Sequence, residues 1–216
     1  MKTAYVIYGT GGCARSIMPI LKQYIDENQI KAELFFVDDN KSINQINDVV
    51  ILNFNELLEL RKNIKQINIY IAIANPQIRK KIYLKLLPNM FNFFNLKANN
   101  SIIMDEVKLD IGCIISPFVT LTSNIKIGKF FHANLYSYVE HDCIIGDYVT
   151  FAPGVKCNGN VIVEDNVYIG SGSTIINGSN QNKIVIGKNS IIGAGSVVIN
   201  SIKPNTKVVG VPAREI

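Results

Sequence analysis

Every sixth residue in the second half of the chain is apolar, and this period limits what the segment can fold into. A strand repeats every two residues and a helix every 3.6, so a strict period of six fits neither element. The spacing predicts short strands joined by turns, three to a coil of about 18 residues, stacked as a parallel β-helix. The series has thirteen consecutive members: Ile103, Leu109, Ile115, Leu121, Ile127, Ala133, Val139, Ile145, Phe151, Cys157, Val163, Ile169 and Ile175.

The repeat is interrupted once and then resumes. The interruption covers residues 177–183, and the apolar series continues five residues out of register at Ile186, Ile192 and Val198. Sixteen hexads correspond to a little over five coils. Because a single coil has no core of its own, the stability of the domain depends on stacking each coil on the next.

The same register places three of the four cysteines in the interior. Cys113 and Cys143 fall at a small inward position, and Cys157 falls at the apolar one. We expect all three to fill the core rather than to act as nucleophiles, which disfavours an acyl-cysteine mechanism. No two cysteines are spaced C-x-x-C, so neither a structural zinc site nor a disulfide framework is expected.

The first half of the chain alternates between strand-like and helix-like segments. Strands are expected at residues 3–8, 34–37, 49–52, 67–74 and 91–94, with helices after residue 12 and at residues 56–61 and 78–87. This alternation predicts a parallel sheet with crossover helices. The predicted fold is an α/β, Rossmann-like half-domain over residues 1–98, followed by the β-helix over residues 99–216. We expect the boundary within residues 95–101.

A glycine-rich turn follows the first expected strand, at residues 9–14 (GTGGCA). Such a turn places backbone N–H groups and a helix N-terminus beside an anion. Asp38 and Asp39 follow the second strand, where a carboxylate can accept hydrogen bonds from a ribose or a base. About 95 residues form only one mononucleotide-binding half, so a single nucleotide is favoured over NAD. A tight turn with solvated aspartates produces the same pattern.

The net charge of +5 lies in residues 1–100, which carry 13 Lys and Arg against 8 Asp and Glu, whereas residues 101–216 carry nine of each. Solvated helix faces or a site for a phosphorylated ligand are both consistent with this excess. No basic-aromatic cluster accompanies it, so nucleic acid is not an expected partner. There is no apolar run of 18 residues and no basic leader with a cleavage site, so we expect a cytoplasmic protein without membrane insertion.

The chain has two histidines, and one of them lies between two carboxylates. The register turns His141 outward, with Glu140 and Asp142 as its neighbours. A carboxylate orients an imidazole and raises its basicity, so His141 is a candidate general base. His132 has no carboxylate within three residues and is expected at the surface or an interface. A β-helix carbonic anhydrase is set aside, because it needs three histidines around a metal.

Residues one coil apart lie side by side in a β-helix, so distant positions can share a site. Gly159 lies 18 residues after His141, and its N–H is a candidate donor to an oxyanion. Pro153 and Ser171 are also one coil apart, and Ala194 continues their row once the five extra residues are subtracted. A row of small residues leaves a groove for an extended arm such as pantetheine, but β-helix turns favour small residues in any case.

Four segments of the chain resemble a known family. Residues 139–147 (VEHDCIIGD), preceded by Asn134, residues 152–161 (APGVKCNGNV) and residues 209–214 (VGVPAR) resemble the sialic acid O-acetyltransferase-like family of hexapeptide-repeat sugar acyltransferases. Residues 71–83 (IAIANPQIRKKIY) are similar to the UDP-4-amino-sugar N-acetyltransferases that make bacillosamine-type sugars for protein glycosylation. The resemblance covers nearly the whole chain.

This resemblance implies a left-handed β-helix and a homotrimer with each active site between two subunits. It implies that acetyl-CoA lies along the β-helix and the nucleotide in the N-terminal domain. Carried over by position, His141 is the base, Asp142 raises its basicity, and Asn134 and Glu140 line the same site. Many relatives carry a histidine at the positions of Cys13 and Thr150. The implied contacts to the nucleotide sugar are Gly11, Gly12, Cys13, Asp38, Asp39, Ala74 and Gln77, and those to CoA are Thr150, Ser171 and Ala194.

The chain is therefore expected to be an acetyl-CoA-dependent N-acetyltransferase that acts on the 4-amino group of a UDP-linked amino-deoxy sugar of the diacetylbacillosamine type. Direct transfer in a ternary complex, without a metal, is the expected mechanism. Alternatives are a sugar O-acetyltransferase of the sialic acid type and an N-acetyltransferase of a dTDP- or GDP-linked amino sugar. A non-catalytic scaffold that binds nucleotide sugars is a further alternative.

Overall fold

The structure is a computed structural model that describes residues 2–216. Contacts divide the chain into two compact units. The first unit runs to Ala74 and takes up again over Ile78–Leu96, and the second contains Asn75–Gln77 and Lys97–Ile216. No helix in the described part of the chain is long and apolar enough to cross a membrane.

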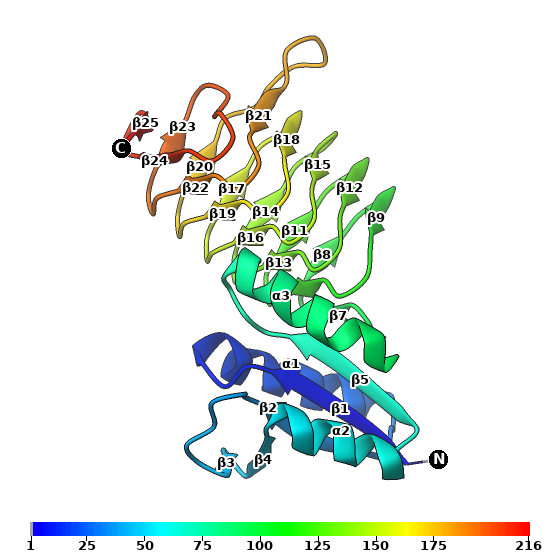
Figure 1. Cartoon of the computed structure of the whole chain (residues 1–216). Helices are drawn as coiled ribbons and strands as arrows, with labels where there is room; N and C mark the ends of the chain where they lie inside the picture. Colours follow the sequence, from blue (N-terminus) through cyan, green and yellow to red (C-terminus); the bar gives the residue numbers. More distant parts are fainter. Residues whose placement is uncertain (1) are drawn as a thin grey trace. The chain divides into compact units, whose positions relative to one another are not determined.

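The first unit is built around a six-stranded sheet in the order β3-β4-β2-β1-β5-β6, shown in Figure 1. All neighbouring strands are parallel except β3 and β4. The chain builds one side of β1 first and then crosses to the other side, so β1 lies at a topological switch point, where α/β sheets bind ligands. The elements are β1 (Thr3–Tyr8), α1 (Gly12–Glu27), β2 (Ala32–Val37), β3 (Gln45–Ile46), β4 (Val49–Leu52), α2 (Phe54–Asn63), β5 (Gln66–Ile71), α3 (Pro76–Leu86), the 3-10 turn η1 (Leu87–Asn89) and β6 (Asn92–Phe93).

Most of these elements differ by a few residues from the sequence expectation, and for α2 and β5 the structure gives the reason. Helix α2 begins two residues early because Asn53 and Glu56 form a capping box, in which each side chain accepts a hydrogen bond from the other residue's N–H, at 2.9 and 2.7 Å. Strand β5 ends three residues early. The carbonyls of Ile73 and Ala74, beyond its end, accept hydrogen bonds from the Arg79 guanidinium instead of continuing the sheet.

The second unit is a left-handed parallel β-helix whose strands form three sheets. The first sheet contains β7 (Leu96–Lys97), β10 (Ile114–Ile115), β13 (His132–Ala133), β16 (Thr150–Phe151), β19 (Tyr168–Ile169), β22 (Ile191–Ile192), β24 (Lys207–Val209) and β25 (Arg214–Glu215). The second contains β8 (Ile102–Ile103), β11 (Thr120–Leu121), β14 (Tyr138–Val139), β17 (Lys156–Cys157), β20 (Thr174–Ile175) and β23 (Val197–Val198). The third contains β9 (Val107–Leu109), β12 (Ile125–Ile127), β15 (Ile144–Ile145), β18 (Val161–Val163) and β21 (Ile184–Ile186).

The coil length agrees with the predicted period. Before the interruption, paired residues are 18 apart, as in Thr120 and Tyr138, whereas Val161 pairs with Ile184, 23 residues further on. The five extra residues lie between β20 and β21, where the repeat was predicted to break. The inward side chains form one continuous core that contains Cys113, Cys143 and Cys157, each fully buried.

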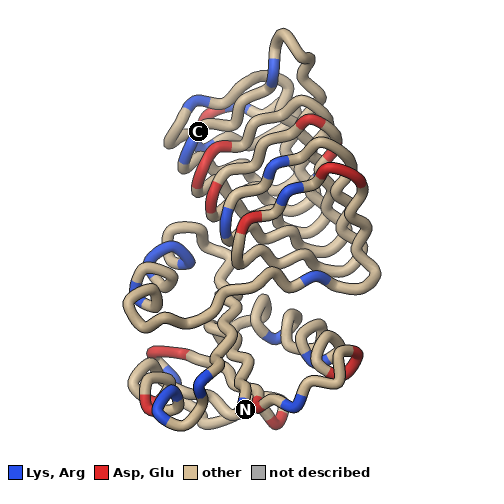
Figure 2. The backbone as a smooth tube through the Cα atoms, turned by 90° about the vertical axis from the view of Figure 1, so that its right-hand side faces the viewer, with Lys and Arg blue, Asp and Glu red and all other residues tan. Residues whose placement is uncertain are grey.

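Three corners separate the three sheets. The His141 corner contains residues 122–124, 140–142, 158–160 and 176–183, and the small-residue corner contains residues 116–118, 134–136, 152–154, 170–172 and 193–195. The third corner carries a row of charges. There, Asp147 accepts a hydrogen bond from the Lys129 N–H at 3.0 Å, and Asp165 accepts one from the Asp147 N–H at 2.9 Å. Figure 2 shows charged residues, blue and red, on successive coils.

Candidate active site

His141 lies on an exposed turn directly after β14. Its side chain is 55% exposed, and its Nδ1 atom lies 2.8 Å from Oδ2 of Asp142. In the neutral imidazole, Nδ1–H then donates to the carboxylate and Nε2 is left as the acceptor. Asp142 has φ +59°, a left-handed turn conformation that recurs every 18 residues at this corner, at Asn124 and Asn160.

The environment of His141 makes its ring more basic. The hydrogen bond to the Asp142 carboxylate raises the pKa of His141 above the ordinary imidazole value. Partial desolvation opposes this shift, and the negative charges of Asp142 and Glu140 add to it. A raised pKa strengthens Nε2 as a proton acceptor, which is what a general base requires.

Gly159 lies against the His141 ring, as the 18-residue spacing predicted. A Cβ atom at this position would lie 2.6 Å from both Cε1 and Nε2 of the ring, so the close approach requires glycine. The Gly159 N–H donates to Oε2 of Glu140 at 3.1 Å. An anionic oxygen therefore already occupies this donor in the described structure.

Two thiols lie beneath this corner. Cys143 and Cys157 are fully buried, and their Sγ atoms lie 3.2 and 3.9 Å from the carbonyl oxygen of Asn158. Their burial confirms the prediction that they fill the core. Above them, the Tyr138 hydroxyl donates to Oδ1 of Asn158 at 2.8 Å and fixes the turn that carries Gly159.

The predicted row of small residues forms on the small-residue corner. The Gly172 N–H donates to the Pro153 carbonyl at 2.9 Å, and the Gly195 N–H donates to the Ser171 carbonyl at 2.8 Å. No heavy atom lies within 4 Å of a Cβ built on Gly172 or Gly195, so the corner is open there. Successive coils thus stack Pro153, Ser171 and Ala194.

The chain does not bring all the predicted residues of the β-helix together. Glu140, Asp142 and Gly159 share the His141 corner, whereas Asn134 lies on the small-residue corner together with the row just described. The Asn134 amide donates to the Phe151 carbonyl at 2.8 Å. The face of the sheet that contains β14 separates the two corners.

Thr150 lies away from both corners, on β16, where it pairs with His132 of β13. The two side chains are buried, with 1% and 2% of their surface exposed. The expectation that His132 lies at the solvent-exposed surface is therefore wrong. The six-residue period predicts that the His132 side chain points outward, but it does not predict whether other residues cover that face of the sheet. Ile114, which pairs with His132 in the same outward row, is also 2% exposed.

In the first unit, the glycine turn leaves open backbone at the N-terminus of α1. Gly11 is the N-cap of this helix, and no heavy atom lies within 4 Å of a Cβ built on Gly11 or Gly12. The Thr10 hydroxyl donates to Oδ2 of Asp38, and the Asn40 N–H donates to Oδ1 at 3.0 Å. This end of the sheet therefore combines an open helix N-terminus with a carboxylate.

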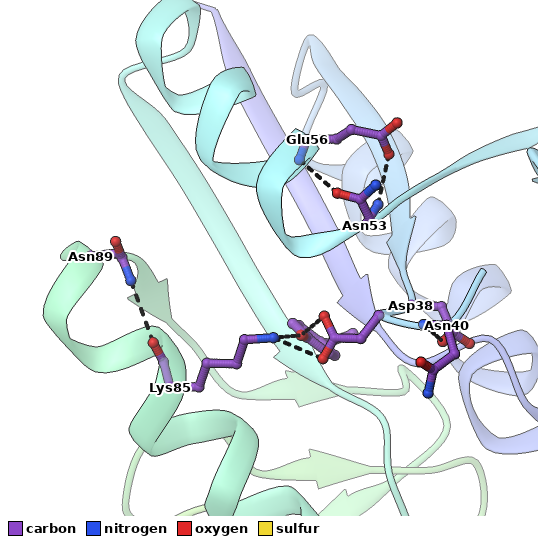
Figure 3. A network of polar contacts seen from close by, with 8 residues as sticks. Asp38, Asn40, Asn53, Glu56, Lys85 and Asn89 are labelled. Carbon is purple, nitrogen blue, oxygen red and sulfur yellow. Dashed lines mark hydrogen bonds and ion pairs between the residues drawn. The ribbon is translucent and has the colours of Figure 1, made fainter.

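The two neighbouring aspartates differ in charge compensation. Figure 3 shows Asp38 beside Asn40, and Lys85 on α3. Lys85 of α3 forms an ion pair with Asp39 at 2.8 Å, and the Tyr8 hydroxyl donates to the same carboxylate at 2.8 Å. Burial and this hydrogen bond to Asp39 raise the pKa of Tyr8, so its hydroxyl stays protonated. The negative charge of Asp39 is thus largely compensated by Lys85, whereas Asp38 accepts hydrogen bonds from uncharged donors.

Arg79 of α3 is fully buried beside the glycine turn. Its Nη1 donates to the carbonyls of Ile73 and Ala74 at 2.6 and 3.2 Å. Burial raises the pKa of the Cys13 thiol, and the Arg79 charge partly offsets this. Gln77, also predicted to contact the ligand, lies in the first turn of α3.

Sequence reasoning missed Arg79 and Lys85 as members of this region. A signal for Arg79 was available, because it precedes Ile82 and Leu86 by three and seven residues and so shares their face of the helix. Lys85 carried no such signal, since its partner Asp39 lies 46 residues away. In the described residues, no cluster of three or more His, Cys, Asp or Glu could hold a metal ion.

Comparisons with known proteins identify the class and the family. A family model described as the PglD N-terminal domain matches residues 5–86. GDP-perosamine N-acetyltransferase of Escherichia coli O157:H7 is 46% identical over 218 residues, covering 98% of this chain and 96% of that protein. WeeI from Acinetobacter baumannii AYE is 41% identical and superposes over the full length of both chains with a TM-score of 0.94.

A third relative shows the same fold at lower identity. The acetyltransferase domain of PglB from Neisseria gonorrhoeae FA1090 is 21% identical, with a TM-score of 0.88 over 99% of both chains. The coiled repeat and the similarity to these N-acetyltransferases define a hexapeptide-repeat acyltransferase. More specifically, the chain belongs to the family of N-acetyltransferases that act on nucleotide-linked amino sugars.

A methyl group at Gly159 should displace the His141 ring without disturbing the core. In Gly159→Ala, the new Cβ would clash with Cε1 and Nε2 of His141 at 2.6 Å, so the ring must rotate away from Asp142. We expect kcat to fall about tenfold or more. Thermal unfolding should stay close to that of the wild type, because the position is on an outer turn. An unchanged kcat would contradict the placement of the ring.

Proposed function

We propose that the chain transfers the acetyl group of acetyl-CoA to the 4-amino group of a GDP-linked 4-amino-dideoxy sugar, with His141 as the general base. The observation that carries the chemistry is the His141–Asp142 pair at 2.8 Å, exposed on a turn with Nε2 facing Gly159. The choice of GDP rests on the 46% identical relative, which is a GDP-perosamine N-acetyltransferase. A UDP-linked sugar, favoured by the sequence resemblance, is the alternative.

The neutral amine attacks the thioester carbonyl, and Nε2 of His141 accepts the proton that the amine loses. The carbonyl oxygen becomes an oxyanion, and the Gly159 N–H is the donor that we assign to it, in place of the Glu140 carboxylate. Collapse of the intermediate breaks the carbon–sulfur bond. The CoA thiolate leaves and takes up the proton, so the base is regenerated.

In the first unit, we assign the open N–H groups of Gly11 and Gly12 to the diphosphate of the nucleotide. Asp38 is the better acceptor for donors of the base or ribose, because Lys85 neutralises Asp39. Asp39 then holds α3 near the site rather than contacting the ligand directly. Cys13, Ala74 and Gln77 stay as proposed lining residues.

The proposed site residues of the β-helix lie on two different corners of one chain. Asn134 and the row of Ser171 and Ala194 lie on a different corner from His141, with a sheet face between them. We therefore propose a homotrimer in which the His141 corner of one subunit meets the small-residue corner of its neighbour, with the pantetheine arm of CoA between them. Thr150, buried within its own chain, is the weakest member of the proposed CoA contacts.

The role of His141 can be tested by pH dependence. His141→Ala should lower kcat by about 10²–10⁴-fold, the usual contribution of a general base. In the wild type, kcat/KM should rise with pH through a pKa above the ordinary imidazole value, because the base must be neutral. Asp142→Asn removes the main cause of the raised His141 pKa, so the rise of kcat/KM should occur at lower pH in this variant. Wild-type activity of His141→Ala would refute the assignment.

The acceptor can be identified with a panel of substrates. Acetyl-CoA is offered with GDP-, UDP- and dTDP-linked 4-amino sugars and with free sialic acid, while thiol release and product mass are recorded. We expect one acetyl group to be added to the GDP-linked sugar with the highest kcat/KM. Preference for a UDP-linked sugar would keep the reaction and change the nucleotide, and turnover of sialic acid alone would overturn N-acetylation.

Mixing two defective variants tests the shared site. His141→Ala and Asn134→Ala damage different corners, so in a mixed trimer some interfaces contain both intact residues. Co-expressed variants should therefore recover a substantial part of the wild-type activity, whereas each variant alone should not. Absence of recovery in mixed trimers, verified by two different affinity tags, would show that both residues act within one subunit.

A further inference from the structure

The interruption of the repeat brings Lys183 to the His141 corner. Residues 177–183 form a loop between β20 and β21, which projects from the end of the β-helix in Figure 1. Within the loop, Ser179 and Asn182 exchange backbone hydrogen bonds at 3.0 and 3.2 Å. The loop is therefore a closed turn rather than an open excursion.

The base of this loop is stacked on the turn that contacts His141. The Gly178 N–H donates to the Gly159 carbonyl at 2.9 Å, and the Asn160 N–H donates to the His141 carbonyl at 3.0 Å. A Cβ at Gly178 would lie 2.6 Å from the Asn160 carbonyl oxygen, so the loop approaches as closely as a backbone can. The loop is thus the next turn stacked on those of His141 and Gly159.

Lys183 reaches back from the end of the loop to the catalytic pair. Its Nζ lies 3.4 Å from the carbonyl oxygen of Asp142, a residue 41 positions earlier. The lysine is half-buried. The hydrogen bond with Cys157 is the main cause that lowers the pKa of the Cys143 thiol, and the positive charge of Lys183 adds to this lowering. Among the described residues, no carboxylate lies within ion-pair distance of Lys183.

The Asp142 peptide is held from both sides. Its N–H donates to the Ser123 carbonyl in the preceding coil at 3.1 Å, and its carbonyl accepts from Lys183 of the loop. Asp142 has a left-handed backbone conformation and a side chain that is 41% exposed, so little else restrains the direction of its carboxylate. We propose that Lys183 is a positioning residue, which acts through the Asp142 backbone to keep the carboxylate on Nδ1 of His141.

This inference rests on the proposed role of His141 and is tested by a readout that does not depend on turnover. Asp142, Glu140 and Cys143 are the titratable groups that face the His141 ring, and each raises its pKa. If Lys183→Met loosens the Asp142 carboxylate, the pKa of His141 measured by NMR should fall toward the ordinary imidazole value. With only two histidines, the resonances are readily assigned.

Kinetics of the same variants separate positioning from other roles. Lys183→Met should lower kcat about tenfold and leave KM for acetyl-CoA within about twofold of the wild type. Lys183→Arg should restore most of the loss, since a donor is retained. In an Asp142→Asn background, Lys183→Met should have no further effect. Lys188→Met, which removes a lysine paired with Asp165 on another corner, is the matched control and should behave as the wild type.

Two results would overturn the proposal. A raised KM for acetyl-CoA with unchanged kcat would mean that Lys183 binds the cofactor directly. An unchanged His141 pKa together with additive effects in the Asp142→Asn background would mean that the loop only stabilises the fold. If His141→Ala is fully active while the His141 pKa still falls in Lys183→Met, the positioning inference stands and the assignment of the base fails.

Discussion

Backbone hydrogen bonds between successive coils fix the site, because they stack residues 18 apart in the sequence. The Asn160 N–H bonded to the His141 carbonyl sets the height of one coil on the next, and Gly159 is thereby brought against the ring. The same contacts bury the inward positions in a single core, so the outward turns are held by many cooperative interactions. An exposed histidine on a short turn is thus held in place although it contacts few neighbours.

Much of this arrangement could be predicted from the sequence, since the six-residue period determines both which residues form the core and which residues stack on successive coils. The burial of Cys143, the outward direction of His141 and the approach of Gly159 all follow from counting by six and by 18. The hydrogen bond between Glu140 and the Gly159 N–H does not follow, because it depends on a side-chain rotamer. The burial of His132 does not follow either, since the period does not predict whether other residues cover an outward side chain.

The first unit was harder to predict because its contacts join segments that have no common period. The glycine turn and the pair Asp38–Asp39 could be located, but not their difference in charge. That difference arises because α3 brings Lys85 to Asp39, while Asp38 meets Thr10 and the Asn40 N–H. A buried Arg79 replaces strand hydrogen bonds at the end of β5 and shortens that strand.

The proposed reaction depends on a neutral His141 whose Nδ1–H donates to Asp142 and whose Nε2 is free to accept a proton. The most direct test is the tautomeric state of His141 by nitrogen-15 NMR in the ligand-free enzyme, above the pKa of the ring. We expect the Nδ1–H tautomer for His141, and its loss in Asp142→Asn. A predominant Nε2–H tautomer in the wild type would contradict the account, because the proton acceptor would then face away from the substrate amine.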